Sequence, residues 1–184
     1  MPIGNFTVIP HIAMQLSAQR PGRVLDLGIG SGFYGAVVRQ WVDLGVRPWN
    51  TFLLGVETWA NYRNPLWDLY NVVVVDTIES YLAGFPELFD SVILGDVLEH
   101  FELSEGTALL RQAQARVTPG GTLIVATPAV FVEQFAVYGN EFERHRSVWT
   151  AAGLESLGFH TVLSGAEAQV AFTPTILAYW IGKG

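Results

Sequence analysis

Acidic residues and glycines stand together where the first buried strand of this chain is expected to end. The run from Val24 to Leu27 is apolar except for one acid, and glycine then occupies every second position. Glycines let a turn pass close to a ligand, and the helix pattern that follows provides free backbone N–H groups. The residues concerned are Asp26, Gly28, Gly30 and Gly32. Their order predicts a nucleotide-type pocket.

Three further acids, Glu57, Asp76 and Asp96, follow the next three expected strands. Because parallel strands end at one edge of a sheet, we expect these carboxylates to gather there with Asp26. A carboxylate after the second strand can accept hydrogen bonds from both hydroxyls of a ribose. Acids are also common at strand ends as helix caps, which explains any one of them more easily than all four in succession.

Candidate proton acceptors are Glu99, His100 and His145. A histidine has an ordinary pKa of about 6.5 and can act as a base near neutral pH, and Glu99 could orient His100. The alternative is that His100 caps or packs the next segment, and that Glu141, Glu143 and Arg144 belong to a solvated charged loop. His11 and His160 are expected to be structural.

The elements that must position these residues alternate between strands and helices. Strands are expected at 23–27, 51–56, 72–75, 91–94, 122–126, 159–163 and 175–181. Helices are expected at 9–20, 34–44, 104–116 and 147–157, with starts at Asn64-Pro65 and at Asp76. This order predicts an α/β fold, a doubly wound, Rossmann-like, mostly parallel seven-stranded sheet with an antiparallel C-terminal hairpin. We expect one domain over residues 1–184, with 1–20 as a leading helix segment.

Composition limits the possible partners and settings. Half of the 184 residues are hydrophobic, the net charge is −7 and cysteine is absent. The missing thiols exclude disulfides, thiolate metal sites and cysteine nucleophiles. The acidic balance argues against a nucleic-acid partner, and no apolar run approaches the roughly 18 residues of a membrane span. With no export signal pattern, a cytoplasmic setting is expected.

The glycine-rich turn resembles the first motif of class I S-adenosylmethionine-dependent methyltransferases. The similarity continues through Gly55-Val-Glu57, Val75-Asp76, the Asp96-Val-Leu-Glu-His100 segment and the Pro-Gly-Gly turn at 119–121, and covers roughly residues 20–165. The resemblance implies S-adenosylmethionine as the cofactor and methyl transfer as the activity.

The resemblance also implies roles for individual residues. Gly28, Gly30 and Gly32 would line the methionine part of the cofactor, with Asp26 supporting the loop or meeting the amino group through water. Glu57 would bind the ribose hydroxyls, Asp76 and the backbone of Thr77 would meet the adenine edge, and Asp96 would border the sulfonium. Phe33 and Tyr34 would either form a wall of the pocket or pack at the start of the helix.

A dinucleotide-binding oxidoreductase is the competing reading. Gly30-Ser-Gly32-Phe-Tyr-Gly35 fits the G-x-G-x-x-G pattern, and Glu57 lies near the expected distance after it. Asp26 ahead of the glycines, the Leu-Glu-His sequence at 98–100 and the lack of a separate substrate domain favour S-adenosylmethionine over NAD.

Several absent features narrow the methyl acceptor. No Asn/Asp-Pro-Pro-aromatic sequence follows the fourth strand, and no Asp/Asn cluster marks a metal site. We therefore expect metal-independent transfer to O or N of a small molecule. The alternative is a protein or glycan acceptor, because no lid domain is evident; a cofactor-binding protein without catalysis is a further alternative. The leading helix, Phe131–Tyr138 or a partner subunit in a homodimer could cover the site.

Overall fold

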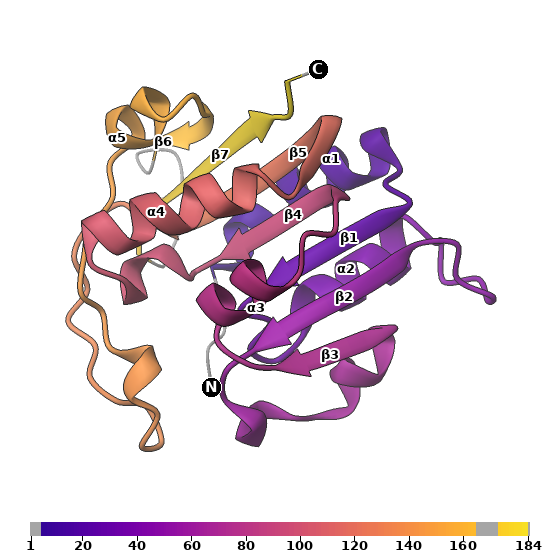
Figure 1. The fold of residues 1–184 in the computed structure, drawn as a ribbon, viewed down its shortest axis with the longest axis horizontal. Coiled ribbons are helices and arrows are strands. Elements are labelled where there is room, and N and C mark those ends of the chain that lie inside the picture. Colours follow the sequence, from indigo (N-terminus) through magenta and orange to yellow (C-terminus); the bar gives the residue numbers. More distant parts are fainter. Residues whose placement is uncertain (1–4, 165–172, 184) are drawn as a thin grey trace.

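The computed structural model describes residues 5–164 and 173–183, and its centre is a seven-stranded sheet with the order β3-β2-β1-β4-β5-β7-β6 (Figure 1). The strands are β1 (Arg23–Leu27), β2 (Phe52–Glu57), β3 (Val72–Val75), β4 (Phe89–Gly95), β5 (Val117–Pro128), β6 (His160–Ser164) and β7 (Thr175–Ile181). The first five strands are parallel to one another, whereas β7 is antiparallel to both β5 and β6. The predicted fold class, including the C-terminal hairpin, is confirmed.

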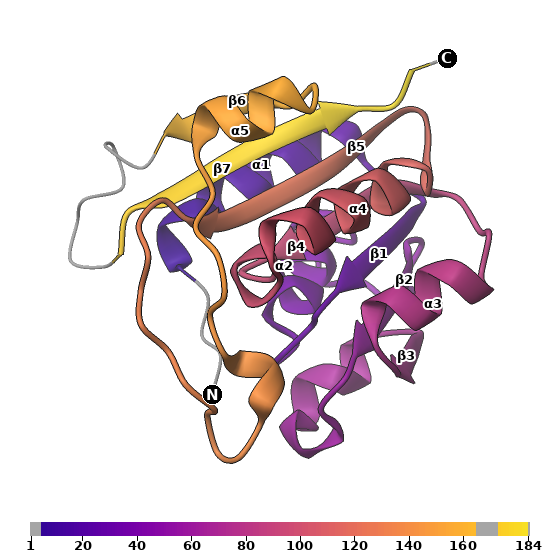
Figure 2. The ribbon, with the colours of Figure 1, turned by 60° about the vertical axis from the view of Figure 1, so that its left-hand side comes forward.

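Helices cover both faces of the sheet (Figures 1 and 2). On one face α3 (Ile78–Gly84), α4 (Leu103–Gln114) and α5 (Ala151–Ser156) bury Leu82, Leu110 and Leu154 against the strands. On the other face α1 (Ile9–Gln19) and α2 (Phe33–Trp41) bury Leu16 and Val38. The central strands β1, β2, β4 and β5 are mostly buried on both sides, as expected for a parallel sheet between helices, whereas the edge strands β3 and β6 have no buried residue.

Five short 3-10 helices complete the chain in the described ranges: η1 (Phe6–Val8), η2 (Ala60–Tyr62), η3 (Pro65–Leu69), η4 (Leu98–His100) and η5 (Glu141–Glu143). The helix expected at Asn64-Pro65 is η3, so the start is right but no α-helix follows. Asn64 caps this turn as predicted, because its side chain accepts a hydrogen bond from the Leu66 amide at 2.9 Å.

Several element bounds differ from the prediction: α2 ends at Trp41 and not at 44, α4 begins at Leu103 and not at 104, and β5 begins at Val117 and not at 122. The helix expected from Ser147 begins only at Ala151, because the side chains of Ser147 and Trp149 donate to the Leu98 carbonyl and hold the preceding segment extended. At α3 the N-cap is Thr77 and not Asp76, since Thr77 Oγ1 accepts a hydrogen bond from the Ser80 amide.

The carboxyl ends of β1, β2 and β4 lie side by side, since Leu27 pairs with Val56 and Asp26 with Ile93. The loops that follow these strands therefore meet at one edge of the sheet. Asp96, directly after β4, has a φ of 53°, a left-handed conformation that side-chain-bearing residues rarely adopt. Residues in such rarely populated backbone conformations are concentrated at active sites and ligand-binding loops.

Helices long and apolar enough to cross a membrane do not occur within residues 5–164 and 173–183. Of the expected leading segment, residues 1–4 lie outside the described residues.

Candidate functional site

A cavity of about 350 Å³ lies at the carboxyl ends of β1, β2 and β4. Its volume is in the range of about 300–1,000 Å³ that small-molecule sites occupy. The glycine turn forms one wall, and the segments after β2, β3 and β4 form others. The leading turn at η1 and the loop around η5 also line the cavity, although both are distant in the sequence from the strand ends.

The glycine turn is left-handed at each of its three predicted glycines. Gly28, Gly30 and Gly32 have φ values of 77°, 50° and 82°. A Cβ on Gly28 would lie 2.7 Å from Val97 Cγ2, so a side chain here would displace the neighbouring wall. Gly28 and Gly30 line the cavity. Gly32 does not belong to the described lining: it packs behind the turn, where a Cβ would meet Trp67 at 3.2 Å.

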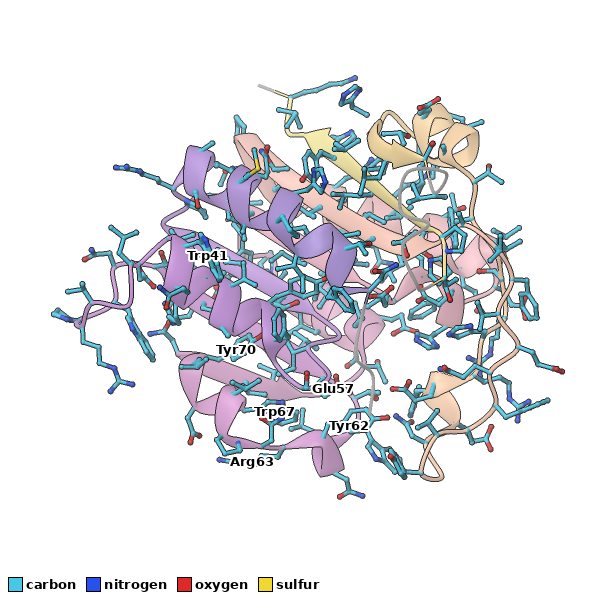
Figure 3. All side chains as sticks on the ribbon, turned by 180° about the vertical axis from the view of Figure 1, so that it is seen from behind. Trp41, Glu57, Tyr62, Arg63, Trp67 and Tyr70 are labelled. Atoms are coloured by element: carbon cyan, nitrogen blue, oxygen red, sulfur yellow. The ribbon has the colours of Figure 1, made fainter. Side chains whose placement is uncertain are left out.

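Glu57 fixes the turn from the end of β2. Its Oε2 accepts a hydrogen bond from the Gly30 amide at 2.8 Å, and its Oε1 accepts one from the Trp59 amide at 2.9 Å. Each carboxylate oxygen has two lone pairs, so both oxygens keep acceptor capacity toward the cavity that Glu57 lines. Burial raises the pKa of Glu57. Figure 3 labels Glu57 together with Tyr62 and Trp67 from the segment that follows β2.

Asp26 lies behind the cavity wall, where it supports the same turn. Its Oδ2 accepts a hydrogen bond from the Tyr70 hydroxyl at 2.6 Å, and the Tyr70 oxygen in turn accepts one from the Gly35 amide at 3.0 Å. Its Oδ1 has no hydrogen-bond partner among the described residues. Burial raises the pKa of Asp26 to about 7. Of its two predicted roles, this geometry favours support of the loop.

After β3, the residues that line the cavity are Thr77, Ile78 and Glu79. Asp76 is turned toward the start of α3: its Oδ1 accepts a hydrogen bond from the Thr77 amide at 2.8 Å and its Oδ2 one from the Ser80 hydroxyl at 2.7 Å. Asp76 itself is therefore not among the residues that line the cavity, whereas Thr77 is.

Asp96 lines the cavity at the end of β4. Its Oδ2 accepts a hydrogen bond from the Asn5 amide at 3.3 Å, and burial raises its pKa to about 6. Tyr34 lies against Gly95, because a Cβ on that glycine would lie 2.6 Å from the Tyr34 oxygen. Phe33 and Tyr34 both line the cavity, so their position agrees with the pocket-wall reading.

The three candidate bases form one cluster. One potential ligand atom each from Glu99, His100 and His145 lies within 4.8 Å of the others, and the two imidazole centroids are 5.0 Å apart. His100 lines the cavity, whereas Glu99 is buried behind it. Glu99 Oε2 accepts a hydrogen bond from Thr127 Oγ1 at 3.0 Å. His145 Nδ1 lies 2.7 Å from the Val132 carbonyl oxygen.

Burial dominates the protonation of this cluster. It raises the pKa of Glu99 well above its usual range, and the nearby Asp96 adds to the rise. Burial and the neighbouring His145 lower the pKa of His100 to about 4. His100 is therefore an unprotonated imidazole at neutral pH, able to accept a proton or to donate its lone pair to a cation.

Two segments considered as possible covers or as an acceptor-side loop contribute individual residues that the sequence did not single out. Asn5, Phe6 and Ile9 bring the leading turn to the cavity, and Asn140, Phe142, Glu143 and Arg146 bring the loop around η5. Glu143 was expected in a solvated loop, which is wrong, because it is 8% exposed. Its Oε1 accepts a hydrogen bond from the Tyr62 hydroxyl at 2.8 Å, a contact across 81 positions that no local pattern reveals.

The chain is similar to known proteins in sequence and in fold. A family model described as a methyltransferase domain matches residues 5–160. No curated protein matches the sequence. Among solved structures, the PH0226 protein from Pyrococcus horikoshii OT3 is 18% identical with a TM-score of 0.67, over 97% of this chain and 89% of that one.

Two structures from Burkholderia thailandensis are also similar. A 1,6-didemethyltoxoflavin-N1-methyltransferase, crystallised with its substrate and S-adenosylhomocysteine, is 17% identical with a TM-score of 0.65, over 96% of this chain and 79% of that one. An O-methyltransferase family protein is 17% identical with a TM-score of 0.61, over 98% of this chain. The present chain spans only 58% of that last protein's length.

Proposed function

Because the chain belongs to the methyltransferase domain family and is an S-adenosylmethionine-dependent methyltransferase, we propose that it methylates O or N of a small-molecule acceptor. When bound, the cofactor supplies a methyl group on a positively charged sulfur. The observation that carries the proposal is the cavity at the strand ends, where Glu57, Gly28 and Asp96 meet. We further propose that residues 1–184 act as one domain.

The donor set of the cavity fits the cofactor. Glu57 offers acceptor lone pairs suited to the two ribose hydroxyls, while its bonds to the Gly30 and Trp59 amides fix its orientation. Thr77 and Glu79 would border the adenine. Gly28 and Gly30 leave space for the methionine part, and Asp96 would face its cationic end. Gly32, Asp26 and Asp76 would act indirectly by holding the two loops.

Charge on the cavity wall supports a cationic ligand. Acidic side chains predominate over Arg146 among the described residues that line it: Glu57, Glu79, Asp96, Glu105 and Glu143. In the described ranges no lysine or arginine forms an ion pair with Glu57 or Asp96. A buried carboxylate without a cationic partner is costly, and a positively charged sulfur beside it would offset that cost.

Aromatic side chains indicate the chemistry of the acceptor. Phe6, Phe33, Phe101 and Phe142 line the cavity, with Arg146 as a cationic group beside them. An apolar or aromatic molecule would pack on these rings, and an anionic substituent would suit Arg146. The leading turn around Phe6 covers part of the cavity, which favours a small acceptor over a protein or glycan.

Catalysis would consist of alignment with assistance from a base. Holding acceptor and methyl donor in line removes most of the entropic cost of the reaction. His100 faces the cavity unprotonated and would accept the acceptor's proton, with His145 and Glu99 beside it.

A second copy of the chain, forming a homodimer, would be one cover for the exposed side chains of Phe131, Phe135 and Tyr138.

Calorimetry and a transfer assay test this function. We expect S-adenosylmethionine and S-adenosylhomocysteine to bind and NAD not to bind. With methyl-labelled cofactor, label should appear in the small-molecule fraction of a cell extract and not in its protein or glycan fractions. Label confined to protein or glycan would overturn the choice of acceptor, and binding of NAD alone would overturn the choice of cofactor.

Variants of the cluster test the base. We expect His100→Ala and His145→Ala to lower turnover while the affinity for S-adenosylhomocysteine stays close to that of the wild type. Wild-type turnover in both variants would contradict a base and leave alignment as the whole of catalysis.

A further inference from the structure

Glu99, His100 and His145 come from two segments that the fold joins at several points. Glu99 and His100 lie in η4 after β4, and His145 lies in the segment between η5 and α5. The Glu99 carbonyl accepts hydrogen bonds from the Arg146 amide at 2.7 Å and the Ser147 amide at 3.2 Å. These backbone bonds fix the segment that carries His145 against the turn that carries the other two side chains.

Contacts behind the cluster orient its ligand atoms. A carbonyl oxygen can only accept, so the Val132 carbonyl at 2.7 Å requires a proton on His145 Nδ1 and leaves the lone pair on Nε2. Glu99 Oε2 is held by Thr127, and the carboxyl group also accepts a hydrogen bond from its own backbone amide. Metal-binding histidines and carboxylates in proteins are usually fixed by hydrogen bonds of this kind to their outer atoms.

The polar neighbours of Glu99 include two imidazoles but no cationic ion-pair partner among the described residues. Glu99 is 3% exposed and faces two imidazoles whose centroids are 5.0 Å apart. In the part of the chain that the structure describes, neither a lysine nor an arginine forms an ion pair with Glu99. Two arginines flank His145 in the sequence: Arg146 directs Nη1 to the carbonyls of His100 and Arg144, and Arg144 pairs with Glu141.

We propose that Glu99, His100 and His145 bind a divalent transition metal, with zinc as the best fit. Two imidazoles and one carboxylate are the three protein ligands of a zinc site that keeps one position open. Their ligand atoms lie within 4.8 Å of one another and must approach to about 3.3 Å for tetrahedral bonds of roughly 2.0–2.1 Å. We expect metal binding to draw the three side chains together by this amount.

The open position of this site would face the cavity, because His100 and the neighbouring Asp96 line it. An oxygen or nitrogen of the acceptor would then be a suitable fourth ligand. The metal would use the one lone pair of the His100 imidazole, so it would lower the pKa of the bound acceptor in place of the base role proposed for His100. This last point rests on the proposed function, whereas the metal site itself rests only on the three side chains. Such a site would differ from the metal-independent transfer expected from the lack of an Asp/Asn cluster.

Metal titration without cofactor or acceptor tests the site. Protein freed of metal with a chelator is titrated with Zn²⁺ by calorimetry and with Co²⁺ by visible absorption. We expect one equivalent of either metal to bind with a Kd in the micromolar range or below. The bound Co²⁺ should show visible d–d absorption bands of a site with low symmetry. Glu99→Gln, His100→Ala and His145→Ala should each weaken binding at least about tenfold. His160→Ala, which changes an exposed histidine on β6, should bind like the wild type.

Two outcomes overturn the site: binding that needs millimolar metal, or equal affinity in the wild type and in all three cluster variants. Thermal unfolding and S-adenosylhomocysteine binding of each variant show whether it is folded, and Glu99→Gln preserves the shape of the side chain. Metal binding without methyl transfer would leave the site standing and count against the proposed function. Methyl transfer by metal-free protein would support the proposed function and would show that the reaction does not need a metal at this site.

Discussion

The carboxylate of Glu57 accepts a hydrogen bond from the amide of Gly30, with 2.8 Å between Oε2 and the nitrogen. The end of β2 is thereby joined to the turn that follows β1. One side chain thus orients the glycine turn and also presents acceptor lone pairs to the cavity.

Replacing Glu57 with Gln should weaken cofactor binding. An amide keeps the shape of the side chain but loses the charge and replaces one acceptor oxygen by a donor. Hydrogen bonds to charged groups contribute about 1.5–3 kcal/mol, so the Kd for S-adenosylhomocysteine should rise by about 10- to 100-fold. Calorimetry measures this change. Glu141→Gln, an exposed glutamate that does not belong to the cavity lining, is the matched control, and equal affinity in both variants would refute the ribose assignment.

Gly95→Ala should force Tyr34 out of its place. The added Cβ would lie 2.6 Å from the Tyr34 oxygen, and overpacking of this kind costs about 1–3 kcal/mol. Adding Tyr34→Ala should make the alanine at position 95 harmless, which a double-mutant cycle of thermal unfolding detects. At Gly84 a Cβ meets nothing within 4 Å, so Gly84→Ala should not destabilise. Additive effects at positions 34 and 95 would show that the two do not compete for space.

Asp26→Asn should change how stability depends on pH. The pKa of Asp26 is about 7 in the folded protein and 3.8 ordinarily, so between these values the folded state holds a proton that the unfolded chain has lost. The contribution of Asp26 to the free energy of unfolding is therefore largest at low pH. It falls by about 4 kcal/mol in total as the pH rises toward 7. Asparagine does not titrate, so this part of the slope should disappear.

Urea unfolding of both proteins between pH 4 and 8 gives the difference curve for Asp26. A difference that does not vary with pH would contradict the raised pKa.

Arg39→Met should destabilise the fold without affecting the cavity. Arg39 is 4% exposed and its Nη1 lies 2.6 Å from Asp43 Oδ2. It also donates to the carbonyls of Thr51 and Leu69 and to the side chain of Asn71. Removing one partner of a buried ion pair costs about 3–5 kcal/mol, because the other charge stays buried. Denaturant unfolding should show this loss of stability. Arg63→Met, which changes an exposed arginine, is the control and should be close to neutral. A loss below about 1 kcal/mol in Arg39→Met would contradict the role of these hydrogen bonds.

The elements that could be predicted from the sequence are those with a strong local pattern. The valine run of β3 and the apolar run of β7 have the expected bounds, because β-branched and aromatic residues between turn signals specify a strand. The segment before α5 could not be predicted, since its extended form depends on bonds from Ser147 and Trp149 to the distant Leu98 carbonyl.

The same distinction holds for the site. The glycine turn and Glu57 were identified because motif and spacing are local. The burial of Glu143 against Tyr62 and the contact of Asn5 with Asp96 join segments far apart in the chain, and nothing in the sequence near either residue indicates its partner.

The position of β7 has a consequence for how the cavity is assembled during folding. Although β7 is the last strand along the chain, it lies between β5 and β6 in the sheet. The apolar edge of β5 therefore stays open until residues 175–181 have been synthesised, and such an edge invites pairing with other chains. Asn5, whose side-chain nitrogen donates to the Thr173 carbonyl at 2.8 Å and to Thr175 Oγ1 at 2.6 Å, finds its anchor only then. The leading turn that lines the cavity can thus be held in this position only once Thr173 and Thr175 have been synthesised.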